Sequence, residues 1–172
     1  MTLSTFDNND EGWILAGGNL YWNNSGGNPG GFIVAEDSIN TYMNIAAPPK
    51  FLGNLSNFNG GTISFDAIEM ENILEPYPSF GLITITSNSN SVSKDLAPDP
   101  LPWSWTHYST TLSAEEWGVS EFEWKEILSN VTEITINLES GMFVGAETVG
   151  VDNIMLKSNP VCTPAINLLL IP

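Results

Sequence analysis

Short apolar runs alternate with turn-forming residues along most of the chain, a pattern that predicts strands far more often than helices. In Thr62–Ile68 every second residue is apolar, with Ile63 and Phe65 on one face, as in a strand with one buried side. Thr132–Leu138 repeats this alternation. The other predicted strands are Leu3–Phe6, Trp13–Ala16, Asn19–Trp22, Phe32–Glu36, Tyr42–Ile45, Gly81–Thr86, Trp103–Leu112 and Gly150–Lys157.

Glycine-rich segments predict how these strands are connected. Gly17-Gly18 predicts a hairpin between the second and third predicted strands, because paired glycines allow the backbone of a tight turn. Ser25–Gly31 and Ser87–Pro102 are rich in Gly, Pro, Asn and Ser, a composition that predicts loops.

One segment, Ser120–Ser129, has the pattern of a helix. Ser120 followed by Glu123 forms a capping box, in which each side chain accepts a hydrogen bond from a free N–H of the first turn. Its apolar side is expected to consist of Phe122, Trp124, Ile127 and Leu128. Many strands and a single short helix predict an all-β fold, an antiparallel β-sandwich of the jelly-roll type.

Composition narrows the possible functions. The 172 residues indicate one domain. With 20 acidic residues against 4 lysines and no arginine, the net charge is −16, so nucleic acid is excluded as a partner because it needs a cationic surface. The single Cys162 and the single His107 leave no disulfide, no Cys/His zinc site and no recognised catalytic motif. We therefore expect no enzymatic activity, and no apolar run is long enough to span a membrane.

Several segments resemble, in the same order, motifs of the laminin B domain, also called laminin domain IV. The matching segments are Phe6-Asp7 with Glu11-Gly12-Trp13 (F-D…E-G-W), Gly30-Gly31-Phe32-Ile33 with Asp37, Ala47–Asn54 (AP-x-K-F-L-G-D), Gly60–Asp66 (G-G-x-L-x-F-D) and Gly150–Ile154 (G-L-D-N-V). Asn54 replaces an Asp of the family pattern, and Asn137 replaces an Arg. The resemblance predicts a domain over residues 1–157, followed by a tail over residues 158–172.

The resemblance implies a non-catalytic interaction or structural module located outside the cell or at the cell surface. Its partner would be an extracellular protein or a glycan. Two alternatives stay open: a carbohydrate-binding module with an aromatic face that stacks on sugars, and a self-assembling subunit of a surface layer or filament.

Carboxylates near the two ends of the domain are candidate calcium ligands. Asp7 and Asp10 follow the first predicted strand, and Asp152 and Asn153 lie at the last one. The first and last strands of a jelly roll are commonly neighbours, and calcium prefers six to eight oxygen ligands. Related carbohydrate-binding jelly rolls hold a structural calcium between these strands, so we expect one here. The alternative is that the aspartates only shape turns.

Exposed aromatic residues are the candidate ligand-binding groups. Trp103 and Trp105 lie two residues apart in one predicted strand, and Tyr77 and Trp22 lie near Gly/Pro-rich segments. Residues two apart share a face of a strand. Core packing is the competing interpretation, since tryptophan is largely buried in most folds. Trp13 and Trp124 are expected in the core.

The tail is uncharged and strongly apolar. Ala165–Ile171 has the length of one strand, and we expect it to dock as an extended segment on its own sheet or on a neighbouring subunit. The alternative is a linker or the remnant of an anchor. The candidate assembly residues are Ile166, Leu168, Leu169, Leu170 and Ile171.

Overall fold

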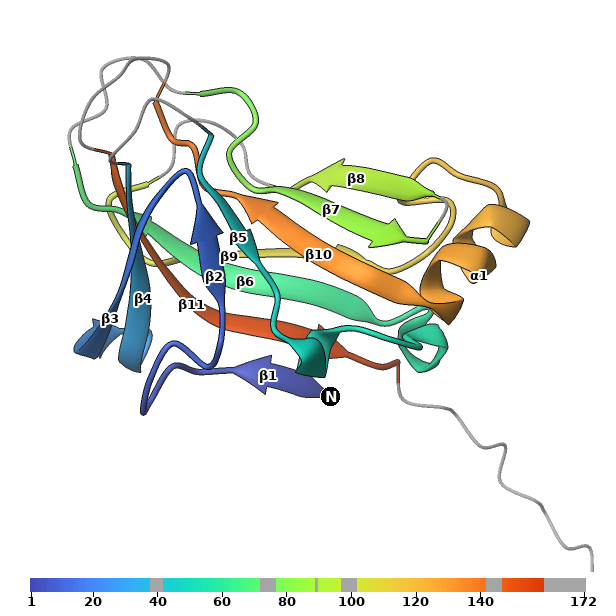
Figure 1. Ribbon diagram of the computed structural model, residues 1–172, viewed down its shortest axis with the longest axis horizontal. Helices are drawn as coiled ribbons and strands as arrows, with labels where there is room; N and C mark the ends of the chain where they lie inside the picture. The colour runs from blue at the N-terminus through green and yellow to red at the C-terminus, as the bar shows by residue number, and fades with distance from the viewer. Residues whose placement is uncertain (38–41, 72–76, 89, 97–101, 142–146, 160–172) are drawn as a thin grey trace, which may run out of the picture.

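A computed structural model describes residues 1–37, 42–71, 77–88, 90–96, 102–141 and 147–159. Two antiparallel β-sheets pack face to face, and a helix closes one end (Figure 1). The predicted all-β sandwich is confirmed. None of the described helices has the length and apolar character needed to cross a membrane.

Each sheet combines strands from distant parts of the sequence. Sheet A has the order β3-β4-β11-β6-β9, with β1 also paired to β11, and sheet B has the order β2-β5-β10-β7-β8. The strands of sheet A are β1 (Thr2–Ser4), β3 (Gly18–Gly27), β4 (Gly30–Asp37), β6 (Thr62–Glu69), β9 (Thr106–Thr111) and β11 (Thr148–Lys157). Those of sheet B are β2 (Ile14–Ala16), β5 (Asn44–Ala46), β7 (Leu82–Ser87), β8 (Ser91–Asp95) and β10 (Val131–Asn137). The helix is α1 (Glu121–Ser129), and two 3-10 turns, η1 (Pro49–Phe51) and η2 (Ser56–Phe58), follow β5.

The first and last strands are neighbours, as expected. β1 pairs antiparallel with β11, with Thr2 opposite Leu156 and Ser4 opposite Ile154. This pairing places the N-terminal turn beside β11, which is the arrangement on which the calcium expectation depends.

The core lies between the two sheets and follows the predicted alternation. Ile63 and Phe65 of β6 point inward from sheet A, and Ile134 and Ile136 of β10 point inward from sheet B; all four side chains are buried. Trp13 and Trp124 are also in the core, as expected. Burial of large apolar side chains on both inner faces holds the sheets together.

The glycine-rich segments were the main errors of the sequence interpretation. The hairpin at Gly17-Gly18 is wrong, because β2 belongs to sheet B and β3 to sheet A. The chain crosses between the sheets at Gly17, where φ is 90°. Gly18 is needed for close approach, since a Cβ there would lie 2.3 Å from the main-chain oxygen of Glu36.

Three other predicted loops and strands have different limits. Ser25–Gly31 is not a loop but the tip of the β3–β4 hairpin, with Gly27 opposite Gly30. The predicted loop Ser87–Pro102 contains β8, which pairs with β7. The predicted strand Trp103–Leu112 begins only at Thr106, so Trp103 and Trp105 do not lie on a strand.

The helix begins as predicted, but one residue of its apolar side was misplaced. The Glu123 amide donates to Oγ of Ser120 over 3.2 Å, which confirms the N-cap. Phe122 is 76% exposed, whereas Trp124 is fully buried. Positions two apart on a helix point to nearly opposite sides, so both cannot face the sheets.

These two aromatic residues of α1 offer a matched test of the packing. Trp124→Ala should lower the free energy of unfolding by about 3–5 kcal/mol, because it removes a buried ring and its hydrogen bond to Oδ1 of Asn59. Phe122→Ala should change it by less than about 0.5 kcal/mol. Urea unfolding followed by circular dichroism measures both. Equal losses for the two variants would contradict the orientation of the helix.

The tail prediction is outside the described residues. Ala165–Ile171, the five candidate assembly residues and Cys162 all lie in the range 160–172. Docking of this segment stays a prediction.

Candidate functional site

The outer face of sheet B carries neutral polar side chains, together with the acidic Glu133 of β10 and Asp95 of β8. Because Ile134 and Ile136 of β10 point into the core, the alternating residues Thr135 and Asn137 lie on the outer side of the sheet. Thr135 is half-buried there, and Asn137 is only 8% exposed. Thr84 of β7 lies opposite Thr135. Hydroxyl and amide groups can each donate and accept hydrogen bonds, so this face can match the hydroxyl groups of a ligand in either sense.

These side chains are already linked to one another across the strands. The hydroxyls of Thr84 and Ser93 lie 2.7 Å apart, which joins β7 to β8. Nδ2 of Asn137 donates to Oδ1 of Asn44 over 3.3 Å, which joins β10 to β5. The face is therefore a connected and partly ordered polar surface.

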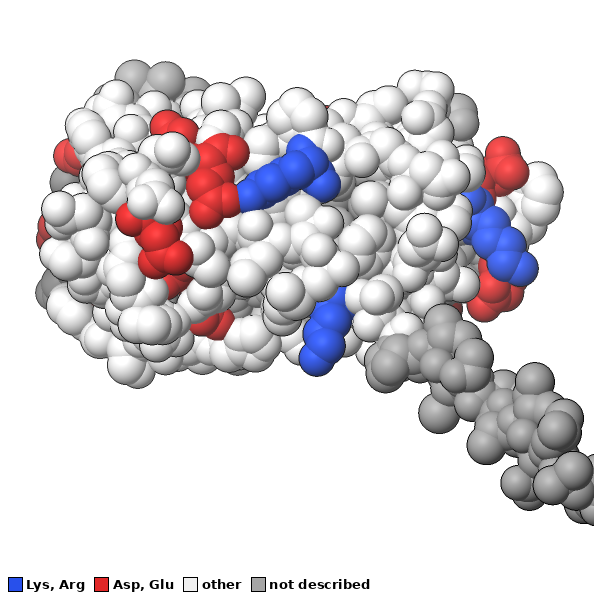
Figure 2. Space-filling model, turned by 90° about the horizontal axis from the view of Figure 1, so that it is seen from below, with Lys and Arg blue, Asp and Glu red and all other residues white. Residues whose placement is uncertain are grey.

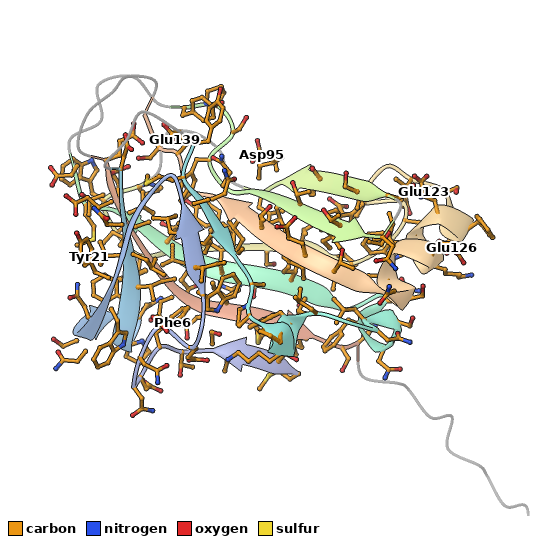
Figure 3. The ribbon with its side chains drawn as sticks, in the orientation of Figure 1. Phe6, Tyr21, Asp95, Glu123, Glu126 and Glu139 are labelled. Atoms are coloured by element: carbon orange, nitrogen blue, oxygen red, sulfur yellow. The ribbon has the colours of Figure 1, made fainter. Side chains whose placement is uncertain are left out.

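A tyrosine pair lies at one end of this face. Tyr42, two residues before Asn44 of β5, is 61% exposed. The ring centroids of Tyr42 and Tyr77 are 5.6 Å apart, with the ring planes tilted by 48°. A hydrogen bond that the Tyr77 hydroxyl donates to Tyr42, together with burial and a smaller effect of the Glu139 charge, raises the pKa of Tyr77 to about 12. Glu139, the next outward position beyond Asn137, is labelled at this end in Figure 3.

The four aromatic residues predicted to bind ligand do not share a face. Trp22 belongs to β3 in sheet A, and its Nε1 donates to the main-chain oxygen of Phe6 over 2.6 Å. Trp105 packs its ring on Phe32 at 5.4 Å and donates to the oxygen of Gly26. Both rings therefore have structural contacts in sheet A. Of the remaining two, Trp103 precedes β9 and is 62% exposed, and Tyr77 lies in the tyrosine pair.

Sequence reasoning missed Tyr42. A signal was present, because Met43 and Ile45 are apolar while Tyr42 and Asn44 are polar or amphipathic. That alternation places Tyr42 and Asn44 on the outer side of the strand. The partnership with Tyr77 is a long-range contact that no local pattern indicates.

An aspartate cluster, made of Asp7, Asp66 and Asp152, surrounds the tip of the β3–β4 hairpin. Asp152 is fully buried. Its Oδ2 accepts the Asn28 amide and its Oδ1 accepts the Asn153 amide, both over 2.7 Å. Burial raises the pKa of Asp152, and the charges of Asp66 and Asp7 raise it further. The like charges therefore lie close enough to act on one another.

Asp66 is the member of the cluster that the sequence did not indicate. It lies opposite Asp152 in the β6–β11 register and is 5% exposed. Its Oδ1 is 2.6 Å from Nδ1 of His107, and its Oδ2 accepts from Nδ2 of Asn28 and of Asn153. His107 of β9 thus contacts a buried carboxylate.

The structure separates the roles of the two N-terminal aspartates. Asp7 is exposed, accepts the hydroxyl of Thr5 over 2.8 Å, and lies over Gly30, where a Cβ would meet its Oδ1 at 2.5 Å. Asp10 accepts the amide of Gly12 over 3.0 Å, which is the turn-shaping interaction that was the alternative to metal binding.

Metal-binding capacity at this cluster depends on oxygens other than carboxylates. Within the described residues, no three His, Cys, Asp or Glu side chains group so as to hold a metal ion. A calcium ion here would need main-chain and amide oxygens in addition to Asp7 and Asp152.

The surface charge is uneven. Figure 2 shows the basic side chains as separate blue patches, with acidic side chains gathered mainly toward one end of that face. Lys50 pairs with Glu11, and Lys94 pairs with Glu116 over 2.8 Å. A multiply charged anion would find little attraction on such a surface.

Comparisons with known proteins define the fold. No protein-family model matches the chain, and a search of curated proteins finds no relative. The L4b domain of human laminin alpha-2 superimposes with a TM-score of 0.61 at 15% identity, covering 74% of this chain and 80% of that chain. The C-terminal family 22 carbohydrate-binding module of Clostridium thermocellum Xyn10B gives 0.51 at 12% identity, covering 92% and 95%. An exo-beta-agarase structure gives 0.64 at 16% identity, covering 91% of this chain and 25% of that chain.

At these identities the likeness shows a shared fold. The chain is a β-sandwich module of the architecture found in a laminin domain and in carbohydrate-binding modules. The laminin resemblance in the sequence is supported at the level of fold.

Asn153 tests the local structure of the aspartate cluster. Its φ is 50°, and its side chain donates to Asp66 and to the oxygen of Asn28. Asn153→Gly loses both bonds but suits the backbone, whereas Asn153→Ala also strains it by about 1–2 kcal/mol. We expect the wild type to have the highest melting temperature, the Gly variant an intermediate one and the Ala variant the lowest. An Ala variant as stable as the Gly variant would contradict the left-handed backbone at this position.

Proposed function

We propose that the chain is a non-catalytic module that binds a neutral glycan on the outer face of sheet B. The observation that carries the proposal is the adjacency of the hydroxyl and amide side chains of this face to the tyrosine pair. Tyr42 and Tyr77 offer apolar ring faces with polar tips. The hydroxyl and amide side chains of the outer face of sheet B offer hydrogen-bond donors and acceptors for sugar hydroxyls.

The charge of the protein supports a neutral ligand. With a net charge of −16 and no arginine, the module lacks the groups that recognise phosphate, sulfate or carboxylate strongly. The likeness in fold to carbohydrate-binding modules supports a binding role, and the laminin likeness supports a location outside the cell or at the cell surface. A structural interaction with an extracellular protein is the function that remains if no glycan binds.

Retardation in native gels that contain neutral polysaccharides tests this proposal. We expect the protein to be slowed by at least one member of a panel of xylan, β-glucan and agarose. Tyr42→Ala and Tyr77→Ala should each weaken binding about tenfold, equivalent to about 1.4 kcal/mol. Phe122→Ala removes a ring on α1 that is even more exposed than that of Tyr42, and this variant should bind as the wild type does. Absence of retardation by every polysaccharide, or equal binding by all four proteins, would reject a glycan site on this face.

We also propose that the aspartate cluster holds a structural calcium ion. The repulsion that the charges of Asp66 and Asp7 exert on Asp152 supports this, because a divalent cation would relieve it. Asp7 and Asp152 would supply carboxylate oxygens, and the side chain of Asn153 with main-chain carbonyls of the hairpin tip would complete the ligand set.

Thermal unfolding with and without a chelator tests calcium binding. Calcium should raise the melting temperature above that in EDTA, since an ion bound only by the native state stabilises it by mass action. Asp152→Asn should abolish the difference between the two conditions. Asp10→Asn, a change to the turn, should retain it. Identical melting curves for the wild type in calcium and in EDTA would show that the cluster is held by its hydrogen bonds alone.

A further inference from the structure

Two carboxyl groups are buried at the end of the sandwich that carries the tyrosine pair. Glu147, which precedes β11, is 2% exposed, and Glu69, at the end of β6, is 3% exposed. Buried carboxylates normally have a cationic partner. Of the four lysines, Lys50, Lys94 and Lys125 pair with Glu11, Glu116 and Glu121, and Lys157 ends β11 at the opposite end of that strand. Glu147 therefore has no cationic partner in the part of the chain that the structure describes.

The surroundings of Glu147 are acidic rather than basic. Its Oε2 accepts the Ser140 amide over 3.2 Å, and the Gly141 amide also hydrogen-bonds its carboxylate. Its Oε1 is buried and has no hydrogen-bond partner among the described residues. The charges that act on it come from Glu139, which follows β10, and from Asp37, at the end of β4. Glu69 lies beyond, close to the Ser140 side chain. An ionised Glu147 would be desolvated, incompletely hydrogen-bonded and repelled.

These conditions favour the neutral carboxyl group. Burial, with added repulsion by Glu139 and Asp37, raises the pKa of Glu147 from 4.5 to about 7. Burial also raises the pKa of Glu69 and of Glu139. The native state therefore binds protons more tightly than the unfolded state does. The stability that Glu147 contributes is fully present below the ordinary carboxyl pKa and is lost as the pH rises through about 7.

Hydrogen bonds connect residues 138–140, and through Ser140 also Glu147, to the segments that carry the tyrosine pair. The Ser140 amide is bound by Glu147, and the Ser140 carbonyl accepts the Tyr77 amide over 2.9 Å. The preceding residue, Glu139, accepts the Met43 amide through its carboxylate, also over 2.9 Å. The Leu138 amide donates to the Met43 carbonyl over 2.8 Å. Residues 138–140 thus hold the segments on which Tyr77 and Tyr42 are placed.

We infer that protonation of Glu147 controls the position of the tyrosine pair; this role of Glu147 is called the latch below. In the neutral form it stays seated beneath Ser140, and residues 138–140 keep both rings in place. In the ionised form it is driven toward water, the segment around Ser140 loosens, and ligand binding weakens. The effect on the ligand rests on the function proposed above, whereas the latch itself is a property of the fold.

Binding measured at two pH values tests the effect on the ligand. The polysaccharide that retards the protein should bind at least about tenfold more weakly at about pH 8 than at about pH 5.5, because the two values lie on either side of the Glu147 transition. Glu147→Gln, a neutral side chain of similar shape, should bind equally well at both. Glu126→Gln makes the same charge change on the exposed side of α1 and should keep the pH dependence of the wild type. A wild-type affinity that is the same at both pH values would overturn the gating of the ligand.

Amide hydrogen exchange tests the latch without any ligand. After correction for the chemical rate, the amides of Met43, Tyr77 and Ser140 should exchange at least about tenfold faster at about pH 8 than at about pH 5.5 in the wild type. They should show no such change in Glu147→Gln. If that variant does not fold, Glu139→Gln serves instead, because it removes one repelling charge and should move the exchange midpoint to lower pH.

The two measurements separate the latch from the function. Accelerated exchange at high pH in a protein that binds no polysaccharide at either pH would leave the latch standing and reject the glycan site. Protection that is the same at both pH values, in a protein that binds polysaccharide, would reject the latch and leave the glycan site standing.

Discussion

The pairing of β11 with three other strands is the interaction on which the rest of the structure depends. One edge of β11 pairs with β6, and the other edge is divided between β4, which pairs with Thr148–Val151, and β1, which pairs with Ile154–Leu156. The change of partner falls at Asp152 and Asn153, where the β6 register also shifts. There the Asn153 amide donates to Oδ1 of Asp152, and Asn28 is hydrogen-bonded to the side chains of Asp152 and Asn153. The buried polar groups of sheet A therefore lie where β11 changes from one pairing partner to the next.

Because the chain has no arginine, its buried carboxylates depend on other hydrogen-bond donors. Asp66 and Asp152 accept hydrogen bonds from amides and a histidine instead of pairing with guanidinium groups. Such donors satisfy a carboxylate at less desolvation cost than a buried ion pair requires. Glu147 accepts hydrogen bonds from the Ser140 and Gly141 amides, but its Oε1 is unbound within the described residues. In Asp66 and Asp152, by contrast, both carboxylate oxygens have hydrogen-bond partners.

The sequence predicted the elements whose signal is local. The alternation in residues 62–68 became β6, and the capping box at Ser120 became the start of α1. The predictions for the glycine-rich segments were wrong because a glycine can allow either a tight turn or the close approach of two backbone segments. Gly31 and Gly61 are examples of close approach, since a Cβ would lie 2.1 Å from the oxygen of Phe6 and 2.0 Å from that of Lys157. Only the tertiary structure distinguishes these uses. The same limit applies to the candidate site: the proximity of Asp7 and Asp152 followed from a general rule about terminal strands, but the partnerships of Asp66 with His107 and of Tyr42 with Tyr77 did not.

The antiparallel pairing of Thr2 with Leu156 also determines how the module can be attached to other polypeptides. Any sequence fused before Thr2 and any sequence fused after Leu156 enter and leave at adjacent points. Glu147 precedes β11 at its other end, about 30 Å away for a strand of ten residues, and Glu139 lies on that distant side in Figure 3. The domain can therefore be inserted into a surface loop of a host protein or displayed in tandem copies, with the tyrosine pair directed away from the points of attachment.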